Sequence, residues 1–255
     1  MIARPVRWLV TLLAVVLSSP QAYAYEIHGL PGSSWGLLSY DNDQISGSGV
    51  QGFVNQGVDW FVLPGDITVN TFVEYRHRSR THNQRYYDAG GPAVGLDLHI
   101  SVVHVGVDYY WENLPVLGEK SERAQAYATT FIEWDLAQEN HPTWFAALPG
   151  SFWGAISYDN DKISGSGVMG FINQGIDWII LPGDIAVNTY AEYRHRSRNE
   201  NQKYYDAGGP AVGLELRKSP VRLGVDYYWE RLPVLGESSE RAQIYFGWYF
   251  DWNLK

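Results

Sequence analysis

The chain contains no cysteine and, after its first residues, no long apolar run, and each absence removes a class of structure. Without cysteine no disulfide can hold the fold together. No later stretch approaches the ~20 continuous apolar residues that a transmembrane helix needs, so a helical membrane protein is excluded. Basic side chains are also few, 19 against 28 acidic ones. This balance argues against nucleic acid as a partner, because nucleic-acid binding depends on an excess of positive charge.

The N-terminal residues have the pattern of a secretory signal. Arg4 and Arg7 precede a short apolar run over residues 8–17, and small residues two apart follow at Ala22 and Ala24. This pattern predicts a cleaved signal peptide over residues 1–24, with a single mature domain over residues 25–255 and a net charge of about −11. An exported chain without disulfides must be held by a large core, a closed sheet or a membrane.

The mature sequence consists largely of two similar segments. Residues 30–136 and 148–254 align without a gap at a constant offset and are about 70% identical, and residues 137–147 connect them. This pattern indicates an internal duplication.

Each copy contains several segments of about ten residues in which apolar and polar side chains alternate. In one of them Val73 and Tyr75 alternate with Glu74 and Arg76, and the second copy repeats the arrangement. Such alternation is typical of a β-strand with one apolar and one polar face. In a soluble sandwich the polar face would be the outer one. Here it is rich in Asp, Glu, Arg, Tyr and Gly, which favours a polar interior.

We expect six strands in each copy. In the first copy they lie near residues 34–41, 49–62, 66–79, 92–100, 102–112 and 122–136. Tight turns at residues 63–66 and around residue 101 alternate with longer connections at residues 42–48, 80–91 and 113–121, rich in Gly, Asn, Ser, Pro and charge. Short turns at one end and longer loops at the other are typical of outer-membrane barrels.

The chain therefore resembles bacterial outer-membrane β-barrel proteins, porin-like, as a class, over its whole mature length and without a narrower family. Six strands enclose almost no volume, so the two copies predict one all-β, twelve-stranded antiparallel transmembrane β-barrel built from two tandem six-strand repeats. Residues 137–147 would form a periplasmic connector. The resemblance implies a place in the outer membrane of a Gram-negative cell. It also implies contact with outer-membrane lipid, lipopolysaccharide and the insertion machinery. Two separate soluble β-domains in the periplasm are the alternative fold.

Aromatic residues fall where this topology needs membrane-interface anchors. The expected anchors are Trp60, Tyr75, Tyr109, Trp111, Trp134, Trp178, Tyr193, Tyr227, Trp229 and Trp252. The two belts are about 24 Å apart, close to the apolar band of such barrels. Members of the class end in a strand recognised by the insertion machinery, and Tyr245, Gly247, Phe250 and Trp252 resemble that insertion signal.

The inward faces carry the residues that would line a lumen or constriction. They are Glu74, Arg76, Arg78, Asp97, Asp108 and Glu112 in the first copy and Glu192, Arg194, Arg196, Glu215, Asp226 and Glu230 in the second. Opposed charge rows across a narrow lumen can select small polar or anionic solutes. Alternatively, the arginines simply neutralise neighbouring carboxylates, because enclosed charges need partners.

Two other groups of polar residues are candidate sites. Asp41 and Asp43, followed by a Ser-Gly run, offer oxygen atoms, but the spacing matches no calcium loop. The same stretch resembles, loosely, the Asn-Asp signature of lipid A 3'-O-deacylases. His99 and His104 face inward but align with Arg217 and Arg222, so the position accepts any polar or cationic group. No histidine spacing indicates zinc.

The repeated segments 86–92 and 114–119 are expected to fold over the barrel mouth, where Arg123 and Arg241 can pair with their acidic residues. We expect a narrow passive channel for small hydrophilic solutes, with no cofactor, no metal and no catalytic residue. A plugged structural or docking barrel of an export system and a lipid A-modifying outer-membrane enzyme are the alternative functions.

Overall fold

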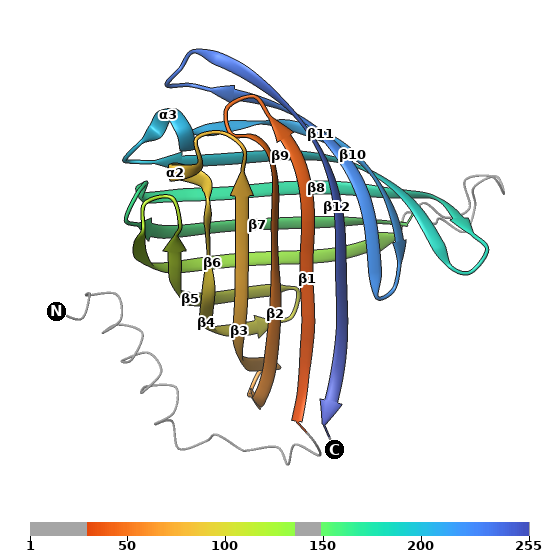
Figure 1. The fold of residues 1–255 in the computed structure, drawn as a ribbon. Helices are drawn as coiled ribbons and strands as arrows, with labels where there is room; N and C mark the ends of the chain where they lie inside the picture. Colours follow the sequence, from red (N-terminus) through yellow and green to blue (C-terminus); the bar gives the residue numbers. More distant parts are fainter. Residues whose placement is uncertain (1–29, 136–148, 255) are drawn as a thin grey trace.

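The chain folds into one closed antiparallel barrel of twelve strands, which Figure 1 draws from the side. The computed structural model describes residues 30–135 and 149–254, so the expected signal peptide and the whole expected connector, residues 137–147, lie outside the described residues. The strands of the first copy are β1 (Leu30–Asp43), β2 (Gly47–Leu63), β3 (Ile67–Arg80), β4 (Ala89–Ile100), β5 (Val103–Leu114) and β6 (Glu119–Asp135). Those of the second copy are β7 (Pro149–Asp161), β8 (Gly165–Leu181), β9 (Ile185–Arg198), β10 (Ala207–Lys218), β11 (Val221–Leu232) and β12 (Glu237–Leu254).

Each strand pairs with its neighbours in the sequence, and the pairing of β1 with β12 closes the ring. The closing seam runs from Leu30 opposite Leu254 to Asn42 opposite Ala242, so almost the full length of both strands is bonded. Strand β6 pairs with β7 in the same way, which joins the two copies into one sheet. The alternative of two separate six-strand domains is therefore wrong, because each copy alone would leave two unpaired edges.

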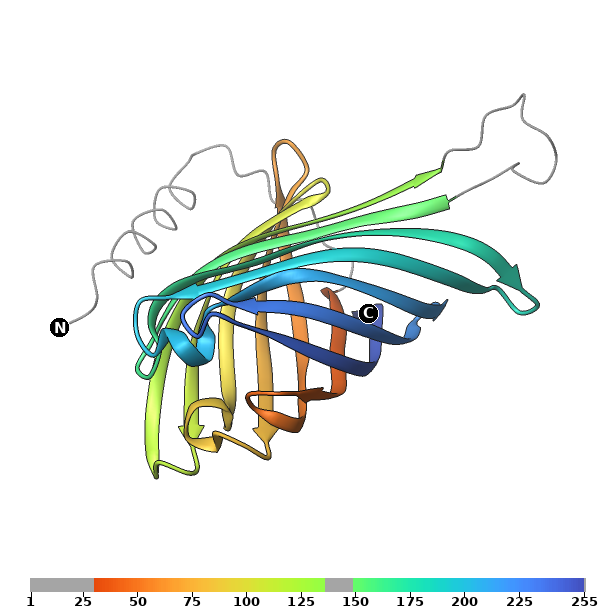
Figure 2. The same ribbon diagram turned by 90° about the horizontal axis from the view of Figure 1, so that it is seen from above.

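The copies occupy different parts of the wall, as the view from above in Figure 2 shows by its colours, which run from orange through yellow to light green in the first copy and from green to blue in the second. In a ring of twelve strands, β3 and β9 are six strands apart and lie on opposite walls. The same holds for the connections that follow them, which contain the short helices α2 (Gln84–Tyr87) and α3 (Gln202–Tyr205). No helix in the described part of the chain is long and apolar enough to span a bilayer.

The burial of side chains is the reverse of that in a water-soluble protein. Large apolar side chains lie on the outer surface, where Val73 is 57% exposed, while charged ones point inward, where Asp41 is only 1% exposed. Contiguous exposed apolar surface of this kind marks a protein that contacts lipid or another apolar partner. The alternation in the sequence therefore predicted the faces correctly.

The expected interface anchors lie on this outer surface. Six are exposed, namely Trp60, Tyr75, Trp111, Trp178, Tyr193 and Trp229. Tyr109, Trp134, Tyr227 and Trp252 are half-buried. Trp60 and Trp178 stand at β-bulges and donate hydrogen bonds from their indole N–H groups to Thr71 and Thr189, at 2.6 and 2.5 Å.

The strands are longer and the connections shorter than the sequence predicts. The expected loops 42–48, 80–91 and 113–121 shrink to residues 44–46, 81–88 and 115–118. The first is tight because the Asp43 carboxylate accepts hydrogen bonds from the backbone N–H groups of Ile45 and Ser46, at 2.6 and 3.0 Å. We call the end of the barrel that carries these connections, α2 and α3 the loop end. The opposite end, with residues 64–66, 101–102 and their counterparts, is the turn end.

Replacing Val73 with Arg tests whether the outer face contacts lipid. Val73 is central in β3 and points outward, so a charge there would be buried in the apolar part of a bilayer. We expect Val73→Arg to lower the free energy of unfolding in lipid vesicles by about 2–4 kcal/mol. Tryptophan fluorescence during urea unfolding measures the change. Val116→Arg, in an exposed connection at the loop end, is the control and should have little effect; equal losses in both variants would contradict a lipid-facing wall.

Candidate functional site: the charged interior

Arg76 is the centre of an ion-pair cluster on one inner wall. Its guanidinium pairs with Glu74 on the same strand and with Asp108 on β5, with Nη2 3.1 Å from the aspartate oxygen. It also donates to Gln125 at 3.3 Å and lies over the ring of Tyr110, 4.5 Å from its centroid. Side chains from three strands thus converge on one cation.

Small residues on the intervening strand make this convergence geometrically possible. Strand β4 lies between β3 and β5, and Ala93 and Gly95 occupy its inner face between Arg76 and Asp108. A Cβ atom at Gly95 would lie 2.1 Å from the Phe72 ring, so the position has no room for a larger residue. The cluster therefore depends on small residues as much as on charged ones.

The opposite wall carries the corresponding cluster around Arg194. Arg194 pairs with Glu192 and lies over Tyr228, 4.0 Å from the ring centroid. Tyr228 and Asn173 donate hydrogen bonds to the Glu192 carboxylate, at 3.2 and 2.9 Å. Since β3 and β9 are on opposite walls, Arg76 and Arg194 face the interior from opposite sides.

The other expected lumen residues also point inward, but they belong to several separate clusters. Asp226 accepts a hydrogen bond from Tyr190 at 3.0 Å, Glu215 accepts one from Tyr245 at 2.7 Å, Glu112 pairs with Arg123 at 3.2 Å and Arg196 lies 4.0 Å from Glu230. Asp97 contacts two histidines. Arg78 is on the same face, with Glu112 and Asp161 near it.

A charge network at the loop end was not among the predicted lumen residues. Arg80 pairs with Asp41, with 2.9 Å between Nη2 and Oδ2, and Arg198 pairs with Asp159 in the same way at 3.0 Å. Arg241 approaches Asp41 at 3.9 Å and Arg123 approaches Asp159 at 3.7 Å. Continuing the alternation of Glu74, Arg76 and Arg78 by one more step reaches Arg80, so the sequence did contain the signal.

Exposure of the inner arginines changes along the barrel. At the loop end the side chains of Arg80, Arg123, Arg198 and Arg241 are 6% to 10% exposed. In the middle section those of Arg76, Arg194 and Arg196 are 29% to 33% exposed. The interior is thus filled near the loops and leaves space beside the arginines further in.

The connections that carry α2 and α3 meet across the loop end, although they start from opposite walls. The rings of Tyr86 and Tyr204 stack with centroids 4.0 Å apart. The Tyr87 hydroxyl donates to the carbonyl of Tyr204 at 2.5 Å, and the Tyr205 hydroxyl donates to that of Tyr86. These four tyrosines, which we call the tyrosine clasp, bridge the opening, and Figure 1 shows α2 and α3 side by side there. This agrees with the expectation that the repeated segment folds over the mouth.

The local sequence explains how each half of the clasp is held. Asn83 has a left-handed backbone with φ of 53°, a conformation that Asn adopts more readily than most residues. Its side chain donates to the carbonyl of Ile45 at 2.8 Å, which ties the connection to the neighbouring turn. The Asp88 carboxylate accepts the backbone N–H of Arg80 at 2.6 Å. Asn201 and Asp206 repeat both features.

The clasp keeps its hydroxyl donors over the ordinary pH range. Burial raises the pKa of Tyr87 from 10 to about 12 and also raises that of Tyr205. A folded-state pKa above the unfolded value stabilises the protonated form. This stabilisation is complete below pH 10 and is lost as the pH rises through about 12.

The carboxylates that offer oxygen atoms for calcium binding or catalysis have structural partners. Asp41 and Asp159 pair with arginines, and Asp43 and Asp161 accept backbone N–H groups of their own turns. A calcium ligand or a general base needs free oxygen atoms. The geometry therefore gives the lipid A-modifying alternative no support at this stretch.

The expected insertion signal lies on β12, the strand that closes the barrel. Phe250 is exposed on the outer surface, whereas Tyr245 is buried in the interior. Trp252 lies over Gly32 of β1, where an added Cβ atom would be 2.3 Å from the indole ring. The aromatic residues of this strand therefore also cover glycines along the seam.

Comparison with models of protein families finds no match, and neither does comparison with curated proteins. Among solved structures, the chain is similar to the beta domain of the Bordetella autotransporter BrkA, with 12% identity, a TM-score of 0.46 and coverage of 88% of this chain and 98% of that one. An outer membrane channel from Pseudomonas putida F1 gives 9% identity, a TM-score of 0.44 and coverage of 91% and 99%. The KdgM porin gives 10% identity, a TM-score of 0.40 and coverage of 84% of this chain and 99% of that one.

Removing one member of the loop-end network should destabilise the barrel. In Arg80→Ala the Asp41 carboxylate stays buried and keeps only the more distant Arg241. We expect the free energy of unfolding to fall by about 3 kcal/mol, the lower end of the range for breaking a buried pair. Urea unfolding followed by fluorescence measures it. Arg85→Ala removes an exposed arginine from α2 and should cost under about 1 kcal/mol; a similar small loss in Arg80→Ala would show that the pair contributes little.

Proposed function

We propose that the protein is an outer-membrane channel that lets small hydrophilic solutes pass through a narrow, charge-lined lumen. The observation that carries this proposal is the pair of partly exposed arginines, Arg76 and Arg194, on opposite inner walls. A barrel whose only role was to fill space would gain more from packing apolar side chains there than from enclosing charges, which are costly to desolvate.

The location follows from the two faces of the wall. An apolar outer surface with a polar interior suits a protein surrounded by lipid, and a closed strand ring leaves no unpaired backbone group at the membrane. The exposed aromatic residues suit the lipid headgroup level. Outer-membrane lipid and lipopolysaccharide would then be the surrounding partners, and the insertion machinery would act on β12.

The charge pattern sets the expected selectivity. Glu74 and Glu192 are almost fully covered by their partners, whereas the guanidiniums beside them remain open to the interior. A permeating solute therefore meets positive groups from both walls, and electrostatic complementarity favours small anionic or polar solutes.

Conductance of the purified protein in planar bilayers tests the proposal. We expect small, discrete channel steps with a preference for anions. Arg76→Gln combined with Arg194→Gln should shift the reversal potential in a salt gradient toward cations, because the opposing carboxylates lose their counter-charges. Arg231→Gln, on the exposed outer face of β11, should leave the reversal potential unchanged. An unaltered reversal potential in the double variant would rule out these arginines as the selective groups.

Opening the tyrosine clasp should increase the current. Tyr86→Ala combined with Tyr204→Ala removes a stacked pair worth about 0.5–1.5 kcal/mol, and we expect larger or more frequent steps. Tyr40→Ala combined with Tyr158→Ala, on the exposed outer face, is the matched control and should leave the conductance as it is. Identical records from the clasp and control variants would mean that the clasp does not limit flow.

The filled loop end favours one rival, a plugged barrel that serves as a docking partner in an export system. That function predicts no conductance from the wild type or from the clasp variant, together with one reproducible co-purifying protein. The bilayer recordings therefore separate the two functions directly.

A further inference from the structure

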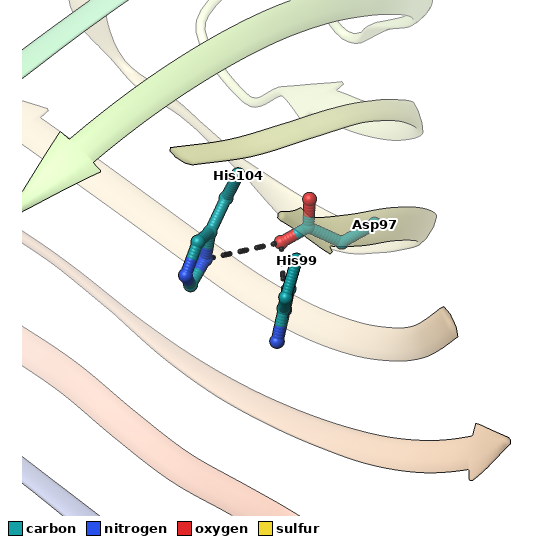
Figure 3. A group of neighbouring side chains, drawn as sticks. All are labelled: Asp97, His99 and His104. Carbon is teal, nitrogen blue, oxygen red and sulfur yellow. Dashed lines mark hydrogen bonds and ion pairs between the residues drawn. The ribbon is translucent and has the colours of Figure 1, made fainter. Parts of the chain in front are cut away.

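Two histidines and an aspartate meet at the turn end of one inner wall, outside the arginine clusters. Asp97 and His99 are on β4, and His104 is on β5 directly opposite His99. The Oδ2 atom of Asp97 lies 3.2 Å from His99 Nε2 and 3.6 Å from His104 Nδ1, as Figure 3 shows with dashed lines. One ligand atom from each residue lies within 4.8 Å of the other two.

These distances are close to those of a metal site. Ligand atoms that bind one zinc ion at ~2.0–2.2 Å in a tetrahedron are about 3.4 Å from each other. The two measured distances bracket that value. The ring centroids are 4.0 Å apart with an angle of 15° between the planes, and one nitrogen atom of each ring faces the same carboxylate oxygen.

In the second copy, arginine residues occupy the positions of the two histidines. There Glu215, Arg217 and Arg222 replace Asp97, His99 and His104. Arg217 pairs with Asp177 and lies 3.7 Å from Glu215, so both carboxylates have a permanent cation.

The first copy lacks that cation. Asp59 corresponds to Asp177, and among the described residues it has the Asn70 amide at 2.7 Å but no arginine or lysine within ion-pair distance. The Asp97 carboxylate contacts the two imidazoles and, within the described ranges, no arginine or lysine. Two carboxylates without a permanent counter-charge in a confined interior favour a bound cation.

We propose that Asp97, His99 and His104 bind one divalent transition-metal ion of the zinc class inside the barrel. Two imidazoles and one carboxylate suit Zn²⁺, Ni²⁺ or Cu²⁺, whereas Ca²⁺ and Mg²⁺ prefer oxygen ligands alone. Three protein ligands leave a position for water or a passing solute. The His104 side chain is 42% exposed, so an ion can reach the site from the interior.

The lack of a complete ligand motif explains why no zinc site was predicted from the sequence. Four residues separate His99 from His104, which is within the spacing of histidine pairs in zinc motifs, but such motifs also carry a pair of cysteines and this chain contains none. The two histidines become neighbours only because a two-residue turn at residues 101–102 places them opposite each other on the inward face.

Zinc titration of detergent-solubilised protein without a histidine tag tests the proposal. Isothermal calorimetry with ZnCl₂ should show one saturable site. His99→Arg combined with His104→Arg copies the side chains of the second copy, where the same hairpin carries Arg217 and Arg222, and should abolish that site. His77→Arg combined with His195→Arg changes two exposed outer-face residues and should retain it.

A second measurement reports the ligands themselves. Co²⁺ in a four-coordinate site absorbs visible light far more strongly than the weakly coloured hexa-aqua ion, so wild-type protein should gain an intense absorption that excess Zn²⁺ removes. If the protein carrying His99→Arg and His104→Arg does not fold, the single substitutions Asp97→Asn and His104→Gln provide the test. Each should weaken zinc binding at least about tenfold. Wild-type protein without saturable zinc binding, or ligand variants that bind as tightly as wild type, would overturn the proposal. Neither measurement uses conductance, so this result is independent of channel activity.

Discussion

The pairing of β1 with β12 is the constraint on which the rest of the structure depends. An open twelve-strand sheet would expose two rows of backbone donors and acceptors, and apolar side chains could not then be kept on a single outer surface. Closing the ring gives every strand a neighbour on each side and turns the alternation of side chains into an inside and an outside. The seam is reinforced by Trp248 and Trp252, which lie over Gly36 and Gly32.

Once the ring is closed, the enclosed charges determine how its interior is organised. Each buried carboxylate needs a donor, and the barrel supplies donors from strands that are not adjacent in the sheet, as Arg76 does for Asp108. The two copies provide these hydrogen-bond donors with different side chains. Where the first copy has Phe72, the second has Tyr190. The Tyr190 hydroxyl donates a hydrogen bond to Asp226, whereas the corresponding Asp108 pairs with Arg76. Where the second has Arg217, the first has His99.

The alternating pattern predicted the number of strands, their faces and the single barrel, because period-two alternation follows directly from strand geometry. It placed the strand ends less well. Residues near Asp43 look like a loop by composition, yet the aspartate side chain closes a tight turn and the strand continues to it. Composition alone does not distinguish a polar strand end from a polar loop.

The residues predicted to line the interior lie on the inner face, whereas their grouping into clusters required knowledge of strand pairing. Glu112 pairs with Arg123 along one hairpin and could have been anticipated from strand register. The contact between Tyr86 and Tyr204 could not, because it depends on the width of the barrel and on the height of two loops from opposite walls. Neither quantity is present in local sequence.

The bridge between α2 and α3 gives the barrel two unlike entrances. At one end four tyrosines and a dense charge network stand between the interior and the surroundings, while at the other the described chain makes only short hairpin turns. A solute crossing the barrel would therefore meet the tyrosine clasp at one end only. An ion bound beside His104 would lie at the opposite end, so the two compartments that the barrel joins would meet unlike chemistry.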